Sequence, residues 1–308
     1  MSRIAVIDCG TNTFHLLIVS YDSKTIKVLH QEKQVVKIGQ GGINNKLITT
    51  AAQGRAIKAL ENFKAKIDKY QVSEIFAFAT SAFRNAENGQ PLRDQVQHIT
   101  SIDLNIIDGM QEAELIYGGV RGAMEIGNGP VLVMDIGGGS VECIIGNAKQ
   151  IFWKQSFEIG AQRLMDLFHR NDPITREEVK TLREYLNFQL IDLFEAVEKL
   201  RPKTLIGSSG TFDTLSEIYC NHMSLDIDQS KTETPLTLSA FKMIHQQLLN
   251  CNREERLAIP GMIEMRVDMI VVASCIIDLI LRKIPIEKIR VSRYALKEGV
   301  LARIVEGE

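Results

Sequence analysis

The sequence is poor in cysteine and arranges its cysteines in no recognisable pattern. Five occur in 308 residues, an odd number, and no two have the spacing Cys-x-x-Cys. This argues against a disulfide framework. Most of the five lie in apolar or helical stretches, so we expect reduced thiols that pack as small hydrophobic side chains in a cytoplasmic protein.

The chain also lacks an excess of positive charge. Its 36 Lys and Arg against 38 Asp and Glu give a net charge of −2, and the pI is about 6.3. A large, uniformly basic surface for nucleic acid is therefore excluded. A polyanionic ligand would have to meet positive charge gathered locally in a cleft.

Long apolar runs and low-complexity segments are missing as well. The most apolar late segment, 269–281, contains Asp278 and is too short to cross a bilayer, so we expect a buried helix and no membrane partner. The first residues enter a predicted strand directly, and no signal peptide is visible. An apolar content of 45% over 308 residues is typical of about two globular domains.

What the sequence does contain is a repeat. Residues 4–19 read IAVIDCGTNTFHLLIV and residues 131–146 read VLVMDIGGGSVECIIG, which places Asp8 and Asp135 127 residues apart. Residues 75–84 and 203–212, IFAFATSAFR and KTLIGSSGTF, align at an offset of 128. Two pairs of segments at nearly one offset indicate a duplicated domain.

The predicted elements follow the same order in each half. Strands are expected at 3–9, 13–21, 25–36, 74–79 and 103–107, with helices at 49–70, from 81 and at 110–124. The second half has strands at 130–135, 139–146, 149–157, 203–207 and 287–291, and helices at 160–168, 175–199, 211–221, 239–249, 262–282 and 294–305; 222–237 is expected to be a loop.

This order predicts an α/β fold with two domains, each built as βββαβα around a mixed sheet. The breaker cluster Gly127–Pro130 sets the boundary, so the domains are 1–126 and 127–308. The final helix, 294–305, is expected to pack back on the first domain. A ligand cleft would lie between the two domains.

The first repeated turn follows Asp8. Two strands joined by a tight turn expose backbone N–H groups at its tip, and Thr11, Asn12 and Thr13 add side-chain donors. Such a turn forms a nest for anionic oxygens. The alternative is a plain β-hairpin, since Asn and Gly in turns need no ligand.

The second repeated turn is richer in glycine. Gly137, Gly138 and Gly139 are costly unless the backbone needs unusual torsions or approaches a ligand closely. The pattern is neither a Walker A loop nor a dinucleotide-binding G-x-G-x-x-G, because a strand follows it. Asp135 ends one strand and Glu142 lies on the next. Two carboxylates beside phosphate-binding amides suit Mg²⁺, although an acidic pair solvated at a strand end is the alternative.

Two charged residues stand in first turns of helices. Arg84 opposes the helix dipole there, so a bound phosphate is a candidate partner, with a surface arginine as the alternative. The N-terminal end of the helix dipole favours the ionised form of Glu112, which suits a general base. The alternative is a structural role, since Glu is common in first turns for stability alone.

A third glycine-containing turn joins a strand to a helix. Its free amides and hydroxyls suit an anion, with ordinary N-capping as the alternative; its residues are Ser208, Ser209, Gly210 and Thr211. His15 aligns with Glu142 and is either a ligand contact or a core histidine. Arg290, Arg293 and Lys297 form either a positive rim or a solvated face.

Together the segments DCGTNTFHLL, ATSAFRNAEN, IIDGMQEAEL, DIGGGSVE, GSSGTF and RVSRYALKEGVL resemble the exopolyphosphatase/guanosine pentaphosphate phosphatase family over residues 4–301. The resemblance implies two ribonuclease-H-like lobes of the actin-like superfamily. Glu112 would then be the base that activates water. Asp135 and Glu142, with Asp8 nearby, would bind Mg²⁺. The phosphates would be held by Thr11, Asn12, Arg84, Gly137, Gly138, Gly139, Ser208, Ser209, Gly210 and Thr211.

The sequence departs from the family pattern at four positions. His15 and Lys297 stand where arginine is common, Val141 where threonine is common and Arg293 where aspartate is frequent. These four changes could alter which substrate the site prefers.

The resemblance implies a Mg²⁺-dependent exopolyphosphatase that releases terminal phosphate by attack of water. Hydrolysis of guanosine pentaphosphate at its 5′ end is the nearest alternative. A nucleotide-dependent kinase and a non-catalytic phosphate sensor of the same superfamily are the others. A homodimer is one expectation for the assembly.

Overall fold

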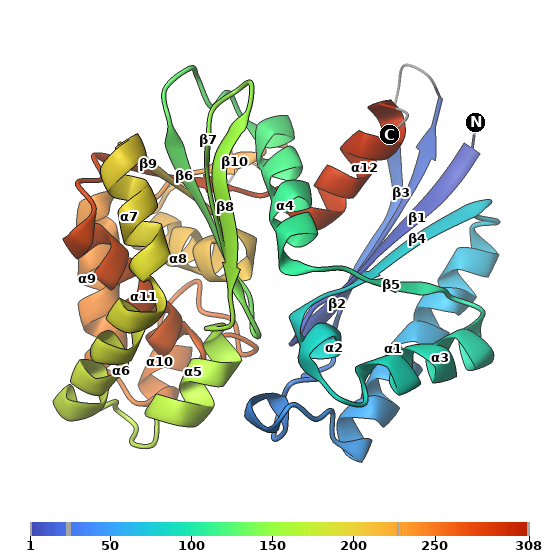
Figure 1. The fold of residues 1–308 in the computed structure, drawn as a ribbon, viewed down its shortest axis with the longest axis horizontal. Coiled ribbons are helices and arrows are strands. Elements are labelled where there is room, and N and C mark those ends of the chain that lie inside the picture. The colour runs from blue at the N-terminus through green and yellow to red at the C-terminus, as the bar shows by residue number, and fades with distance from the viewer. Residues whose placement is uncertain (1, 23–25, 227, 229, 307–308) are drawn as a thin grey trace.

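The computed structural model describes residues 2–22, 26–226, 228 and 230–306, and within these it contains two mixed sheets (Figure 1). The first sheet has the order β3-β2-β1-β4-β5, from β1 (Ser2–Cys9), β2 (Thr13–Tyr21), β3 (Ile26–Val35), β4 (Glu74–Ala79) and β5 (Leu104–Ile106). The second has the order β10-β11-β9-β6-β7-β8, from β6 (Val131–Ile136), β7 (Val141–Gly146), β8 (Ile151–Phe157), β9 (Thr204–Ser208), β10 (Glu233–Thr234) and β11 (Lys288–Ser292).

Both sheets are built on one plan. In the first, β1 is antiparallel to β2 and parallel to β4, and in the second β6 has the same relation to β7 and β9. β3 and β8 follow at one side, and β5 and β11 at the other. The predicted α/β fold with two ribonuclease-H-like domains is therefore confirmed. The βββαβα unit is extended by β5 and the helix after it in the first domain, and by β11, with the two-residue β10 paired to it, and the helix after it in the second.

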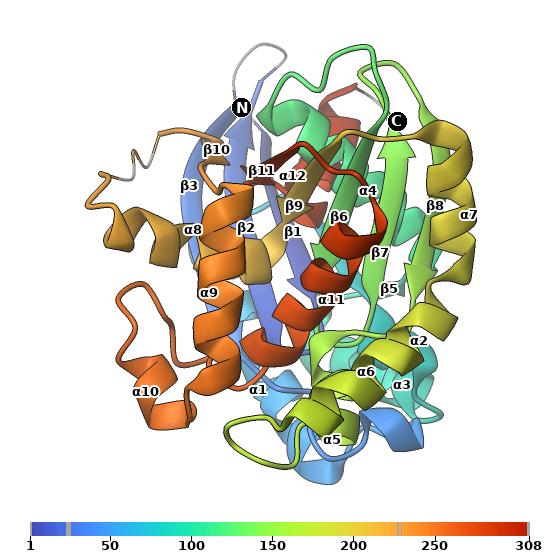
Figure 2. The ribbon, with the colours of Figure 1, turned by 90° about the vertical axis from the view of Figure 1, so that its left-hand side faces the viewer.

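The helices cover the sheets in layers. The first lobe, which is the first sheet with its helices, contains α1 (Thr50–Lys69), α2 (Ser81–Asn85), α3 (Gly89–Thr100) and the short 3-10 helix η1 (Ile43–Asn45). The second lobe contains α5 (Ala161–Phe168), α6 (Arg176–Gln189), α7 (Ile191–Leu200), α8 (Ser209–His222), α9 (Leu238–Asn250), α10 (Arg253–Leu257) and α11 (Ile270–Lys283), and Figure 2 shows α6, α9 and α11 over the outer face of its sheet. α4 (Gly109–Ala123) and α12 (Leu296–Glu306) lie between the two sheets (Figure 1).

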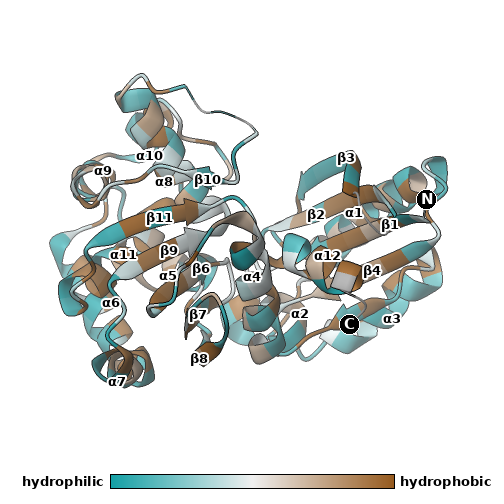
Figure 3. Cartoon of the chain, turned by 90° about the horizontal axis from the view of Figure 1, so that it is seen from above, coloured by the Kyte–Doolittle hydropathy of each residue, from teal (hydrophilic) through white to brown (hydrophobic). Residues whose placement is uncertain are grey.

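The central strands place their side chains alternately in two cores. On β1, Ala5 and Ile7 pack in the core shared with α1, whereas Ile4 and Val6 pack between the two sheets. β6 repeats this division in the second lobe, and apolar residues gather on the strands of both sheets (Figure 3). Because successive strand residues point to opposite faces, the residue two places after Val6, which is Asp8, also faces the other lobe.

α12 returns from the second sheet to pack against β1 and α4. Two glycines permit this close approach. A Cβ on Gly299 would meet the carbonyl oxygen of Leu115, and a Cβ on Gly119 would meet that of Ala295. The predicted boundary at 126/127 falls in the connection between α4 and β6.

Several predicted elements differ in detail from the structure. The long helix 175–199 is broken at Leu190 into α6 and α7, and the helix expected from 262 begins at Ile270. The residues before Ile270 form turns around Gly261, whose φ of +93° is left-handed. α3 and α10 were not predicted. Within the described residues, no helix is long and apolar enough to cross a membrane.

A few predicted ranges extend beyond the described residues. Residue 25 of the predicted strand 25–36 and residues 227 and 229 of the predicted loop 222–237 lie outside the described residues, as do residues 1, 307 and 308 at the ends of the two predicted domains. β10 lies inside that loop and pairs with the end of β11.

Candidate active site

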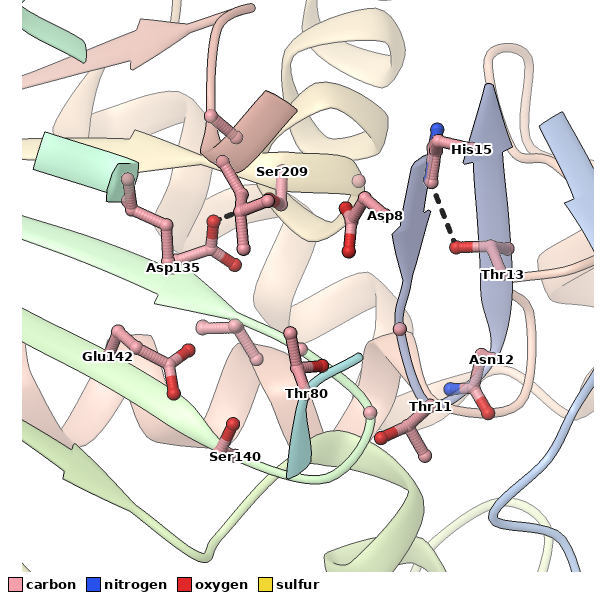
Figure 4. A pocket seen from close by; sticks show the side chains of 18 of the residues that line it. Asp8, Thr11, Asn12, Thr13, His15, Thr80, Asp135, Ser140, Glu142 and Ser209 are labelled. Carbon is pink, nitrogen blue, oxygen red and sulfur yellow. Dashed lines mark hydrogen bonds between the residues drawn. The ribbon is translucent and has the colours of Figure 1, made fainter. Parts of the chain in front are cut away.

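A cavity of about 130 Å³ lies between the lobes, where the repeated turns face each other (Figure 4). The structure brings most of the predicted site residues to this cavity: Asp8, Thr11, Asn12, Glu112, Asp135, Gly137, Gly138, Gly139, Glu142, Ser209 and Gly210. Arg84, Ser208 and Thr211 do not line it. The two halves of the repeat thus contribute to one site.

The two repeated turns share their backbone geometry. The amide of Gly10 donates to the carbonyl oxygen of Thr13 at 3.1 Å, and the amide of Gly137 donates to that of Ser140 at 3.0 Å. The tips of the turns approach each other closely. A Cβ on Gly138 would collide with the side chain of Asn12. Glycine is therefore needed at this position because the other lobe occupies the space of a side chain.

Four of the predicted site residues are carboxylates at the cavity: Asp8, which is half-buried, and Glu112, Asp135 and Glu142, which are buried. Burial raises the pKa of Asp8 to about 7, against the opposing charge of Lys297. Burial, with Glu112 and Asp135 nearby, raises the pKa of Glu142 well above its usual range. Each carboxylate is therefore costly to ionise without a cation nearby.

Asp135 is held by the turn that follows β9. Its Oδ2 accepts hydrogen bonds from the hydroxyls of Ser208 at 2.9 Å and Ser209 at 2.5 Å, and Figure 4 shows Ser209 directed at this carboxylate. Ser209 has a left-handed φ of +66°, a conformation uncommon for residues other than glycine. Burial raises the pKa of Asp135, and the two serines oppose that effect.

Thr211 faces away from the cavity. Its hydroxyl lies 3.4 Å from the carbonyl oxygen of Ile136 and is buried. Ser208 is also fully buried. Both side chains hydrogen-bond to the end of β6, at Asp135 and Ile136, whereas Ser209 and Gly210 reach the cavity wall.

Glu112 lies in the first turn of α4, where Asp108 and Gln111 form a capping box. Its Oε2 accepts a hydrogen bond of 2.9 Å from Nη1 of Arg84, and the same nitrogen donates to the carbonyl oxygen of Ile107 at 3.0 Å. Burial raises the pKa of Glu112 to about 7, although Arg84 lowers it. Arg84 thus contacts the predicted base directly.

Two cations that the sequence did not single out also line the cavity: Lys33, on β3, and Arg266, in the turns before α11. Arg293 and Lys297 of the predicted rim line it with them, and Arg290 does not. Arg266 is only 8% exposed, and its buried Nε has no hydrogen-bond partner. A Cβ on Gly210 would collide with the guanidinium of Arg266, so the glycine and the arginine depend on each other.

The fold brings two further residues to the cavity wall. Asp213 on α8 lines the cavity, and burial raises its pKa to about 6 against the charge of Arg266. His15 also lines the cavity, and its ring contacts the hydroxyl of Thr13 at 3.1 Å. Burial and the charge of Lys297 lower the pKa of His15 to about 3, so the ring is uncharged at neutral pH. Its alignment with Glu142 was the one sequence signal for a position at the site.

The donors around the cavity can be tested against the predicted magnesium ion. Within the described part of the chain, no group of three or more His, Cys, Asp or Glu side chains is arranged to hold a metal by itself. Mg²⁺ commonly takes one or two carboxylates and completes its shell with water and phosphate oxygens. One or two of Asp8, Asp135 and Glu142 could therefore hold an ion whose other ligands are water and the phosphate oxygens of a substrate.

The fold and this cavity define a class: two actin-like lobes whose glycine-rich turns and carboxylates meet in the cleft between them. The sequence profile of the Ppx/GppA phosphatase family matches residues 17–308, and the chain belongs to that family.

Individual relatives agree with this assignment. The chain is similar to the crystal structure of an exopolyphosphatase from Cytophaga hutchinsonii, with a TM-score of 0.96 and 45% identity, covering 99% of this chain and 98% of that one. A Ppx/GppA family member from Aquifex aeolicus gives a TM-score of 0.80 at 25% identity, covering 99% and 98%. Exopolyphosphatase 1 of Mycobacterium leprae is 27% identical over 308 residues, 99% of this chain and 90% of that protein.

Proposed function

We propose that this phosphatase is an exopolyphosphatase, which releases orthophosphate from the end of inorganic polyphosphate with the help of Mg²⁺. The observation that carries the proposal is a cavity in which Glu112 and four further carboxylates meet Lys33, Arg266, Arg293 and Lys297 beside the glycine turns. The names of the Cytophaga and mycobacterial relatives support the same activity.

The size and lining of the cavity favour polyphosphate over guanosine pentaphosphate. At about 130 Å³ it is smaller than the pockets of about 300–1,000 Å³ that enclose drug-sized ligands. Among the described residues that line it there is no Phe, Tyr or Trp on which a guanine base could stack, and His15 supplies the one small aromatic ring. Hydrolysis of guanosine pentaphosphate remains the second candidate, because its terminal phosphates could use the same donors.

Each group in the cavity has a role in such a reaction. Glu112, when ionised, accepts a proton from the attacking water, and Arg84 holds its carboxylate in place. The turn amides, Asn12 and Arg266 would bind the phosphoryl oxygens on which charge develops. The side chains of Asp8, Asp135 and Glu142 would hold Mg²⁺, which when bound offsets negative charge on the phosphates.

The decisive experiment measures phosphate release in parallel from polyphosphate, guanosine pentaphosphate and ATP, each with Mg²⁺ and with EDTA. We expect the highest kcat/KM on polyphosphate with Mg²⁺ and no turnover in EDTA. Faster release from guanosine pentaphosphate would favour the second candidate. Activity that persists in EDTA would remove the metal from the proposal.

A further inference from the structure

Glu158 lies between β8 and α5, at a point where the two lobes meet. Its Oε2 accepts hydrogen bonds from the hydroxyl of Ser81 at 2.8 Å and from Nη2 of Arg163 at 3.0 Å, and its Oε1 lies 3.3 Å from Nη2 of Arg84. Ser81 and Arg84 belong to the first lobe and Arg163 to the second. One carboxylate, which no sequence motif indicated, therefore joins the lobes.

On the first-lobe side, this contact fixes a guanidinium that reaches the proposed base. Arg84 donates through Nη1 to Glu112 and to the carbonyl oxygen of Ile107, and through Nη2 to Glu158. A planar guanidinium held through both terminal nitrogens has little rotational freedom. The side chain of Arg84 is only 17% exposed, so water replaces a lost partner poorly.

On the second-lobe side, the contact reaches the glycine turn. Arg163 donates through Nε to the carbonyl oxygen of Gly139 at 2.8 Å and through Nη1 to that of Ile43 at 2.9 Å, across the lobes. Glu158 thus stands at the centre of a chain of contacts that runs from Gly139 through Arg163 and Arg84 to Glu112.

We propose that Glu158 is a positioning residue of the active site, which sets the base Glu112 relative to the glycine turn by holding Arg84 and Arg163 from the two lobes at once. The inference rests on the proposed function, because it assigns Glu112 its catalytic role. Glu158 does not line the cavity. It acts through Arg84 and touches no reacting atom.

A purely structural ion pair would behave differently. The side chain of Glu158 is 40% exposed, whereas those of Arg84 and Arg163 are 17% and 11% exposed, and a Gln at this position keeps an oxygen that accepts a hydrogen bond. Glu158→Gln should therefore change the unfolding midpoint less than it changes turnover, because it mainly disturbs the orientation of Arg84. Small displacements of catalytic groups can cost as much as about 10²-fold in rate.

The first test compares Glu158→Gln with a matched control, Glu177→Gln, whose side chain on α6 is 78% exposed. On polyphosphate we expect Glu158→Gln to lower kcat by about 10-fold to 10²-fold with KM within about twofold, and the control to match the wild type. An unchanged kcat would overturn the proposal.

A double-mutant cycle tests whether Glu158 works through Arg84. If it does, Glu158→Gln should have little further effect on kcat once Arg84→Lys is present, since residues in one network are not additive. Effects that simply multiply would overturn the positioning role.

A third readout does not depend on turnover and so separates this inference from the proposed function. Glu158→Gln should speed hydrogen exchange of the backbone amides of α2, Ser81–Asn85, while Glu177→Gln should not. Unchanged exchange in α2 would refute the contact chain even if the wild type were fully active. Faster exchange in Glu158→Gln, together with a wild type that releases no phosphate from polyphosphate, would support the contact chain while rejecting the proposed substrate.

Discussion

Glu112 is buried between the lobes, and its protonation state is the single-residue property on which the proposed reaction most depends. A glutamate in water is ionised at neutral pH, but burial raises the pKa of Glu112 to about 7. Without Arg84, whose charge lowers that pKa, the carboxylate would be still harder to ionise. The arginine thus keeps a buried base usable near neutral pH.

This predicts a specific pH dependence. A base acts only when ionised, so kcat/KM at fixed Mg²⁺ should rise with pH through about 7 and level off above it. Glu112→Gln should lower kcat by about 10²–10⁴-fold. The wild-type profile and the turnover of Glu112→Gln, with binding of polyphosphate measured separately, check both points. A variant with near-normal turnover would remove Glu112 from the mechanism.

At the scale of elements, the sequence was most informative where the chain repeats a local pattern. The two Asp-containing strand–turn–strand units were visible because alternation and turn residues are local properties, and both turns form the same hydrogen bond at Gly10 and Gly137. Arg266 was missed because a helical pattern continued through its segment. The start of α11 is delayed by a turn at Gly261 whose conformation depends on packing against Glu217 and Ile218.

The packing of α12 on α4 can be tested with two glycines of one helix. Gly119→Ala should destabilise the protein by about 1–3 kcal/mol, because its Cβ would meet the backbone of Ala295. Gly122→Ala, whose Cβ would meet nothing within 4 Å, should be neutral or stabilising by up to about 1 kcal/mol. Urea unfolding of the two variants measures the difference. Equal midpoints would mean that α12 does not pack as closely as described.

At the scale of the whole molecule, the site depends on contacts that no local pattern encodes. Asn12 donates to the sulfur of Met269, 257 residues away, at 2.8 Å, and Arg163 reaches Ile43 across 120 residues. The resemblance to the family predicted that the motifs meet at one cleft. Only the fold showed that Lys33, Asp213 and Arg266 join them, and that Arg84 faces Glu112 and not the cavity.

The burial of four carboxylates in one cleft makes a prediction about the entire fold. Asp8 and Glu112 have their pKa raised from 3.8 and 4.5 to about 7. A carboxyl whose pKa is raised by folding stabilises the native state below its unfolded pKa, and this contribution is lost as the pH rises through the folded pKa. The metal-free protein should therefore lose stability between about pH 4 and pH 7.

A divalent cation among these carboxylates would relieve their repulsion where they are ionised. Mg²⁺ should consequently raise Tm more at pH 8, where the carboxylates are ionised, than at pH 5.5. A ligand that binds only the native state stabilises it by about 2.7 kcal/mol at one hundred times its Kd. Thermal unfolding with MgCl₂, against NaCl of equal ionic strength, measures this without any substrate. Asp135→Asn should reduce the shift. A Mg²⁺ effect equal at both pH values, or matched by NaCl, would show that the carboxylates of the cleft do not bind the ion.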